Sequence, residues 1–263
     1  MTTRTTLLSV AVAAVAAVLA SPVSARAEDF RWHGAIPQGH SIEIKGVNGD
    51  VRAEPSGSNE VEVVAEKRAT RDNPDTVRIE VVPHAGGVTI CAVYPSRDGS
   101  KPNECRPGKE GRMNTQNNDV QVRFTVRVPA GVTFLGKTVN GEVEATRLNG
   151  DVALNTVNGS VTFSTTGGGS ASTVNGSIKG EMGRADWTDT LEMSTVNGSI
   201  TLTLPSTLST DVRASTVNGD INTDFPMTIT GRVSRRKVEG TIGGGGRVLS
   251  VESVNGSITL KRE

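Results

Sequence analysis

One short motif recurs along most of this chain and constrains its fold more than any other feature. The hexapeptide Thr-Val-Asn-Gly-Ser-Ile occurs at 173–178 and again at 195–200. A looser form is Val or Leu, Asn-Gly, then Asp, Glu or Ser, then Val or Ile. It occurs eight times, at 47–51, 139–143, 148–152, 157–161, 174–178, 196–200, 217–221 and 254–258. Residues 238–242 form a ninth copy in which Glu239 replaces Asn. Such recurrence predicts a repeat architecture.

The Asn-Gly pairs are the candidate structural positions of this repeat. They are Asn48 and Gly49, Asn140 and Gly141, Asn149 and Gly150, Asn158 and Gly159, Asn175 and Gly176, Asn197 and Gly198, Asn218 and Gly219, and Asn255 and Gly256. Asn-Gly between apolar residues ordinarily signals a tight hairpin. A hairpin around Asn197-Gly198 would pair Val196 with Ser199 and mix apolar and polar side chains on both faces. A strand running straight through places Val196, Gly198 and Ile200 on one face. We therefore expect strands that pass through Asn-Gly.

The spacing of the copies predicts a coiled chain. From 139 to 161 the apolar positions recur at gaps of 4, 5, 4, 5 and 4 residues. A gap of five moves a side chain to the other face of a strand, so corners are expected at 145–147 and 154–156. Two such sides make a coil of about 18–22 residues, which predicts an all-β, parallel β-helix-like solenoid. Inward glycines would let its walls approach closely. An antiparallel meander or sandwich is the alternative.

The first 27 residues resemble a secretory signal peptide. Arg4 precedes a small apolar run at 7–20, and Ala25-Arg26-Ala27 forms an A-x-A cleavage site. Cleavage between Ala27 and Glu28 would leave 263 − 27 = 236 residues, enough to bury a sizeable core. We expect an exported protein, periplasmic, secreted or at the cell surface, without a transmembrane segment after cleavage.

The remaining chain is expected to form one β-solenoid domain at 28–263. Residues 28–130 are its less regular part, and 131–263 carry the dense repeats. After cleavage, 26 Lys and Arg oppose 28 Asp and Glu, a net charge of −2, which argues against a nucleic-acid partner. The charged tail Lys261-Arg262-Glu263 is expected to blunt the exposed edge of a last coil.

The two cysteines, Cys91 and Cys105, bracket most of a polar insertion at 91–119. In an exported chain such a pair is typical of a disulfide. Closing a loop of about 15 residues is worth roughly 3 kcal/mol. His33, His40 and His84 have no metal-ligand spacing with the pair. We therefore expect a disulfide, no metal site and no cofactor.

The motif string resembles a known bacterial family. Val126-Arg-Val-Pro-Ala-Gly131 followed by Thr138-Val-Asn-Gly-Glu-Val143 is similar to DUF4097 proteins, as are 215–221, 242–246 and 253–260. Members of that family are described as adhesins or β-strand repeat proteins. The resemblance covers nearly all of 30–263. It implies an exported solenoid-like protein at the envelope, and it supplies no catalytic residues.

The outward Asn, Ser and Thr side chains are expected mainly to face solvent and to bond to neighbouring coils. A polysaccharide-active enzyme is the alternative function, with Asp50, Glu142, Asp151 and Asp220 as candidate acids. Its paired carboxyls would need to lie about 5–9.5 Å apart.

A second alternative is an envelope protein that binds lipid or a small ligand. Trp32 and Trp187 are expected to pack, and the basic run at 232–237 is expected to be a solvated loop. The favoured function is a non-enzymatic adhesin or scaffold. Its partner is unknown, with envelope polysaccharide or another envelope protein as candidates.

Overall fold

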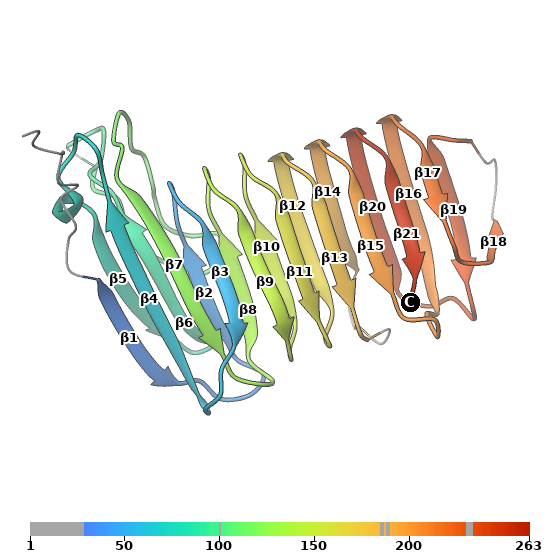
Figure 1. Ribbon diagram of the computed structural model, residues 1–263, viewed down its shortest axis with the longest axis horizontal. Helices are drawn as coiled ribbons and strands as arrows, with labels where there is room; N and C mark the ends of the chain where they lie inside the picture. The colour runs from blue at the N-terminus through green and yellow to red at the C-terminus, as the bar shows by residue number, and fades with distance from the viewer. Residues whose placement is uncertain (1–28, 100, 185–186, 188–189, 230–233) are drawn as a thin grey trace, which may run out of the picture.

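The computed structural model describes residues 29–99, 101–184, 187, 190–229 and 234–263. The predicted signal peptide at 1–27 and its cleavage site at Ala27 and Glu28 lie outside these residues. The molecule is a long stack of β-strands that run across its long axis, in two layers that face each other (Figure 1).

Ten strands form the first layer, sheet A, in the order β1-β4-β7-β3-β9-β11-β13-β15-β21-β17. Their bounds are β1 Phe30–Ala35, β3 Val51–Pro55, β4 Glu60–Arg68, β7 Gln121–Val128, β9 Val143–Leu148, β11 Val161–Thr165, β13 Ile178–Met182, β15 Ile200–Leu204, β17 Ile221–Thr223 and β21 Ile258–Arg262.

Eleven strands form sheet B, in the order β18-β19-β16-β20-β14-β12-β10-β8-β2-β6-β5. Their bounds are β2 Ser41–Lys45, β5 Arg78–His84, β6 Gly87–Val93, β8 Thr133–Lys137, β10 Val152–Asn155, β12 Gly169–Asn175, β14 Leu191–Asn197, β16 Thr210–Asn218, β18 Met227–Ile229, β19 Lys237–Ile242 and β20 Val248–Asn255. A 3-10 turn, η1, spans Pro74–Thr76. No helix in the described ranges is long and apolar enough to cross a membrane.

Each coil contributes one strand to each sheet, and successive coils stack in parallel register. Val143 pairs with Val161, Val161 with Ile178, and Ile178 with Ile200. The Val or Ile that ends the motif therefore forms a continuous buried column in sheet A from Val51 to Ile258, whereas Val152 lies in β10 of sheet B. The all-β, solenoid-like prediction is confirmed, with open sheets rather than a closed barrel.

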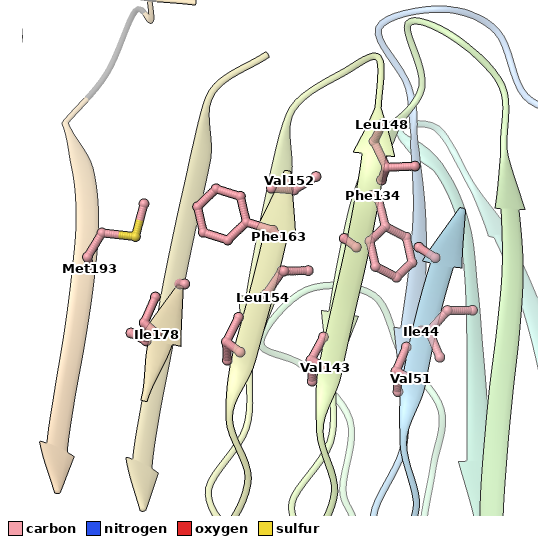
Figure 2. Close-up of a cluster of buried hydrophobic side chains, with 14 of the residues drawn as sticks. Ile44, Val51, Phe134, Val143, Leu148, Val152, Leu154, Phe163, Ile178 and Met193 are labelled. Atoms are coloured by element: carbon pink, nitrogen blue, oxygen red, sulfur yellow. The ribbon is translucent and has the colours of Figure 1, made fainter. Parts of the chain in front are cut away.

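The space between the sheets is filled mainly by aliphatic side chains, as the low aromatic content requires. Ile44, Val51, Val143, Leu154 and Ile178 are all buried, and Figure 2 shows them arrayed along the stack. Two phenylalanines, Phe134 and Phe163, add bulk to this core. Burying one such side chain is worth about 1.5–3 kcal/mol, so the stacked core is the main source of stability.

The expectation that strands run straight through Asn-Gly is wrong. β14 ends at Asn197 and β15 begins at Ile200. Asn197-Gly198 is thus a bend that carries the chain from sheet B to sheet A. Val196 is exposed and Thr195 is buried, the reverse of the predicted faces, because the bend interrupts strand alternation. Asn197-Gly198 does not close a hairpin, since β14 and β15 belong to different sheets.

The predicted corners and glycine positions also need correction. Residues 145–147 lie inside β9, and residues 154 and 155 lie inside β10. The glycines at the bends do not face the core. A Cβ added to Gly176 would lie 2.0 Å from the carbonyl oxygen of Gly159 in the preceding coil. These positions require glycine because adjacent coils approach there through their backbones.

The coils are not stacked in sequence order at the C-terminal end. β20 lies between β14 and β16, and β21 lies between β15 and β17. The last coil is therefore internal, and its charged tail does not blunt a sheet edge as predicted. The ninth motif copy lies in β19, which pairs antiparallel with β16. It lies between β16 and the edge strand β18 and is not part of a coil.

Candidate functional site

Seven of the eight Asn-Gly pairs lie in a single column along one edge of the solenoid. We call this column the Asn-Gly edge. In stacking order its pairs are Asn48-Gly49, Asn140-Gly141, Asn158-Gly159, Asn175-Gly176, Asn197-Gly198, Asn255-Gly256 and Asn218-Gly219. Each joins a strand of sheet B to the following strand of sheet A. Asn149-Gly150 is the exception, because it joins β9 to β10 and lies at the opposite edge.

The asparagine side chains of this edge form one chain of hydrogen bonds. Each Nδ2 donates to the Oδ1 of its neighbour toward the N-terminal end, and all six distances are 2.8 Å. The first amide, of Asn48, donates to the carbonyl oxygen of Asn118 at 3.1 Å. The amides therefore share one direction. The prediction that outward polar side chains bond to adjacent coils is confirmed here.

A buried column of hydroxyl groups fixes the bends from inside. In six of the seven coils of this edge, the hydroxyl two residues before the Asn donates to the glycine carbonyl of the neighbouring coil, at 2.8–3.0 Å. The donors are Thr138, Thr156, Thr173, Thr195, Ser253 and Thr216. This bond satisfies a buried polar group and explains why Thr, rather than Val, points inward.

The valines between these hydroxyls and the asparagines form an exposed apolar column. We call Val139, Val157, Val174, Val196, Val254 and Val217 the valine stripe. The first five are 38–39% exposed and Val217 is 56% exposed. They make up six of the eight large hydrophobic residues that are exposed in the described chain. A contiguous apolar column on a polar surface is unusual and marks a candidate contact surface.

Of the candidate acids, only Asp50 and Glu142 lie in adjacent coils, where the Glu142 amide donates to Oδ1 of Asp50 at 3.1 Å. Asp50, Glu142 and Asp220 follow glycine in the Asn-Gly edge, but Asp220 lies in the last coil of the stack. Five coil spacings separate it from Glu142, about 24 Å at roughly 4.8 Å per strand. Asp151 lies at the opposite edge, where it accepts a hydrogen bond from the Gly168 amide at 2.8 Å.

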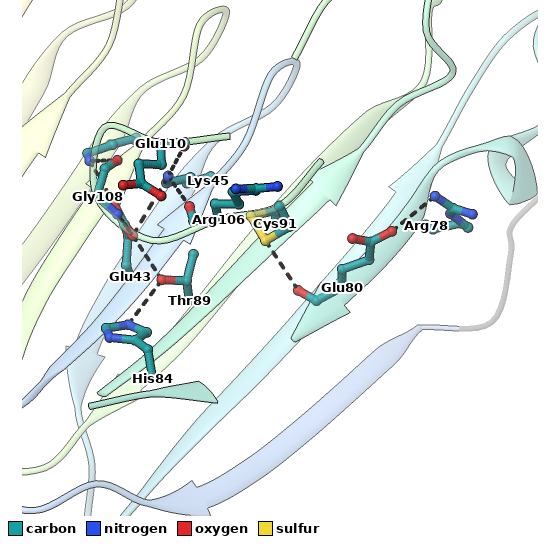
Figure 3. Close-up of a disulfide and its surroundings, with 12 residues drawn as sticks. Glu43, Lys45, Arg78, Glu80, His84, Thr89, Cys91, Arg106, Gly108 and Glu110 are labelled. Atoms are coloured by element: carbon teal, nitrogen blue, oxygen red, sulfur yellow. Dashed lines mark hydrogen bonds and ion pairs between the residues drawn. A yellow bond between two sulfur atoms is a disulfide. The ribbon is translucent and has the colours of Figure 1, made fainter. Parts of the chain in front are cut away.

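The polar insertion covers the outer face of β2, β6 and β8, and a disulfide fastens it there. Cys91 and Cys105 are bonded, with Cα atoms 5.7 Å apart. Both are buried, and Figure 3 shows the surroundings of the disulfide at Cys91. Tyr94 anchors the start of the insertion, donating to the Val120 carbonyl oxygen at 2.8 Å. Burial raises the pKa of Tyr94 to about 12.

Beneath the insertion lies Glu43, a carboxylate with only 2% of its side chain exposed. It accepts hydrogen bonds from Lys137 at 2.6 Å, from Thr89 at 2.9 Å and from the Gly108 amide at 2.9 Å (Figure 3). Burial alone would raise the pKa of Glu43, but the three hydrogen bonds outweigh burial and hold that pKa below its ordinary value. Glu43 therefore ties the insertion to the sheet as a carboxylate.

Two lysines complete this attachment. Lys45 donates to the carbonyl oxygens of Arg106 and Glu110, and Lys137 donates to that of Gly108 at 3.1 Å. Burial lowers the pKa of Lys45, although Glu43 opposes the shift. Beside these lysines is a pocket of about 230 Å³ that reaches Val139, the first valine of the stripe.

The structure also places the two tryptophans and most of the basic run at 232–237. Trp187 is buried, and Trp32 packs partly buried against the core. Lys237 pairs with Glu239 at 3.0 Å, and the Arg235 carbonyl oxygen accepts from Ile221. Arg232 lies outside the described residues. Among the described residues, no group of three or more His, Cys, Asp or Glu side chains is placed to hold a metal ion.

Sequence reasoning missed Glu43 and the valine stripe. Glu43 occupies an outward strand position in Ser41-Ile-Glu-Ile-Lys45, where a charged residue is ordinarily solvated. Its burial depends on an insertion more than 60 residues away, so no local signal announces it. The stripe had a signal, because Val precedes Asn in seven of the eight copies. The assumed straight strand placed it on the wrong face.

Comparison with protein families finds one match, to the family described as Toastrack DUF4097, over residues 35–261. Comparison with curated proteins finds no match. Among solved structures, the chain is similar to a candidate cell adhesion protein from Clostridium sporogenes, at 12% identity, with 90% of this chain and 100% of that chain covered and a TM-score of 0.48.

Two further structures are similar over most of their length. A candidate adhesin from Bacteroides fragilis is 11% identical, with 90% of this chain and 97% of that chain covered and a TM-score of 0.38. A candidate lipid-binding protein from Parabacteroides distasonis is 12% identical, with 88% and 96% covered and a TM-score of 0.20. All three TM-scores are below 0.5, so the family match alone carries the assignment.

Proposed function

The chain belongs to the Toastrack DUF4097 family, and on that premise we propose that it is an exported, non-enzymatic adhesin or scaffold of the cell envelope or surface. The observation that carries this proposal is the Asn-Gly edge with its valine stripe. Six amide bonds of 2.8 Å hold seven asparagines in line, beside six exposed valines. A surface of fixed period suits a repetitive ligand, because each coil repeats the same contact.

Two further features support an envelope location. The first 27 residues have the charge, apolar run and cleavage site of a secretory signal. The Cys91–Cys105 disulfide is of a kind that persists in oxidising compartments outside the cytosol. The similar adhesins are described as candidates, and their ligands do not transfer to this chain.

The test is binding of the chain from residue 28 to washed envelope fractions: peptidoglycan, outer-membrane vesicles and surface polysaccharide. Release of soluble fragments is followed in parallel. Saturable retention on one fraction without fragment release is the expected result. Fragment release would replace the proposal with a polysaccharide-active enzyme. Lack of retention on every fraction would also overturn it.

A further inference from the structure

The pocket at the N-terminal end of the valine stripe contains two cations without ion-pair partners among the described residues. Four cations line it: Lys45, Lys109, Arg112 and Lys137. Lys137 and Lys45 both pair with Glu43, at 2.6 and 3.9 Å, and the Lys45 ammonium also donates to backbone carbonyls. Neither Lys109 nor Arg112 forms an ion pair with any described residue.

Arg112 is unusual among these cations. Its side chain is half-buried, and its Nε is buried without a hydrogen-bond partner among the described residues. A buried donor that is left unsatisfied costs about 1–3 kcal/mol, so such groups call for an explanation. Two carboxylates also line the pocket: Glu104 is paired with Arg106 at 2.8 Å, and Glu110 acts on Lys45, whose pKa its charge raises. Lys109 and Arg112 both line the pocket, so an anion that enters it would meet both positive charges.

The pocket and the valine stripe form one continuous surface. Val139 belongs to both, and the exposed side chain of Met113 adds an apolar wall. In the preceding coil the equivalent residue, Val47, is buried. The stripe therefore begins at the pocket, under the disulfide-fastened insertion, and extends from there toward the C-terminal end.

Polar side chains flank the stripe on both sides. The asparagine column lies on one side. On the other, Lys137, Asn155, Ser172 and Ser194 stack in register at half-exposed positions. From Val139 to Val196 this second column carries no acidic residue, and Glu252 follows only in the next coil. The four coils span about 14 Å at roughly 4.8 Å per strand.

We propose that this surface binds an extended acidic polysaccharide, an inference that rests on the proposed function. Sugar rings present C–H faces and hydroxyl edges, which match an apolar stripe between two hydrogen-bonding columns. The acidic group at one end of the bound segment enters the pocket at Lys109 and Arg112. The guanidinium of Arg112 is suited to carboxylate and phosphate alike. The cavity, about 230 Å³, is smaller than the roughly 300 Å³ of the smallest drug-sized sites, which suits one charged sugar unit.

The test is isothermal titration of the chain from residue 28 with four probes: tetragalacturonate, galacturonate monomer, neutral cellotetraose and inorganic phosphate. We expect tetragalacturonate to bind at least tenfold more tightly than the other three, and more weakly as salt rises. Equal affinity for the monomer or for phosphate would overturn the inference, because it would indicate a simple anion site that does not use the stripe.

Two variants locate the binding surface. Lys109→Gln/Arg112→Gln removes the unpaired charge, and Lys179→Gln/Lys261→Gln, on the outer face of sheet A, is its matched control. Val196→Glu places an acid in the stripe, and Thr201→Glu places one on the outer face of the same coil. We expect each test variant to lose about tenfold in affinity and each control to be unchanged. Undiminished binding by either test variant would overturn the inference.

The envelope-retention assay separates this inference from the proposed function. If Lys109→Gln/Arg112→Gln is retained on an envelope fraction as well as the unmodified chain is, the acidic-polysaccharide inference is wrong while the adhesin or scaffold proposal stands. Lack of retention of the unmodified chain on every fraction would overturn the proposed function itself.

Discussion

The side-chain amide of Asn255 donates a 2.8 Å hydrogen bond to Oδ1 of Asn197, although 58 residues separate them in the sequence. The same two residues pair in the parallel register of β14 and β20. The last coil is thus inserted between the β14–β15 and β16–β17 coils. The stack is completed only when the C-terminus of the chain enters it.

Because the last coil lies inside the stack, we expect β21 to be as important to stability as the strands in the middle of the stack. Ile258 is fully buried between Ile200 and Ile221 in sheet A. We expect Ile258→Ala to lower the free energy of unfolding by about 2–5 kcal/mol, measured by chemical denaturation. The exposed control Lys261→Ala should change it by less than about 0.5 kcal/mol. A frayed terminal coil would make both changes equally mild.

The asparagine column predicts a cost that depends on the number of bonds lost. Asn197 donates to Asn175 and accepts from Asn255. Asn197→Ala should therefore cost about 1–2 kcal/mol of unfolding free energy, because two exposed hydrogen bonds of roughly 0.5–1.5 kcal/mol each disappear. Asn222→Ala, at an exposed position of β17, is the control. Equal stability of the two variants would show that the column contributes nothing.

Backbone contact between coils predicts a severe effect at the bend glycines. A Cβ at position 176 would lie 2.0 Å from the Gly159 carbonyl oxygen, whereas one at Gly57 would meet no atom within 4 Å. We expect Gly176→Ala to destabilise the fold by about 3 kcal/mol or more. Gly57→Ala should be neutral or slightly stabilising. A thermal melt that does not distinguish them would contradict the close stacking.

Glu43 predicts a specific pH dependence. Its pKa is lowered in the folded chain, so its stabilising contribution is complete above the ordinary carboxyl pKa, near 4.3. That contribution is lost as the pH falls through the lowered value. At pH 7, Glu43→Gln should cost about 3 kcal/mol, because Lys137 loses its buried partner. The difference from the unmodified chain should shrink under acid.

The control for that experiment is Glu144→Gln. Glu144 pairs with Arg52 at 3.6 Å with both side chains well exposed, so its loss should cost less than about 1 kcal/mol at either pH. A difference between Glu43→Gln and the unmodified chain that stays constant down to pH 2.5 would argue against a buried carboxylate that attaches the insertion.

Most of the fold could be predicted from the sequence repeat. Its spacing predicts parallel coils, and Val143, Val161, Ile178 and Ile200 do form one buried column. The faces at the bend could not be predicted, because strand alternation assumes a continuous strand. Thr195 points inward only because the neighbouring coil supplies the Gly176 carbonyl oxygen as a hydrogen-bond acceptor.

The order in which distant segments stack could not be predicted from local sequence patterns. Nothing in the spacing between the copies at 217–221 and 254–258 indicates that the later one lies inside the stack, because both carry the same motif. The pocket is hidden for the same reason. Lys109 and Arg112 lie on the insertion and Val139 on a repeat, and these segments are brought together by the disulfide, Glu43, Lys45 and Lys137.

The central claim is that this protein holds its ligand along the Asn-Gly edge, and side-chain amide NMR during titration tests it most directly. The isotope-labelled chain is titrated with soluble polysaccharide from whichever envelope fraction retains it. We predict shifts of the Asn140, Asn158, Asn175 and Asn197 amides, with Asn149 at the opposite edge unchanged. Shifts that leave those four amides unchanged, or that centre on Asn149, would contradict the claim.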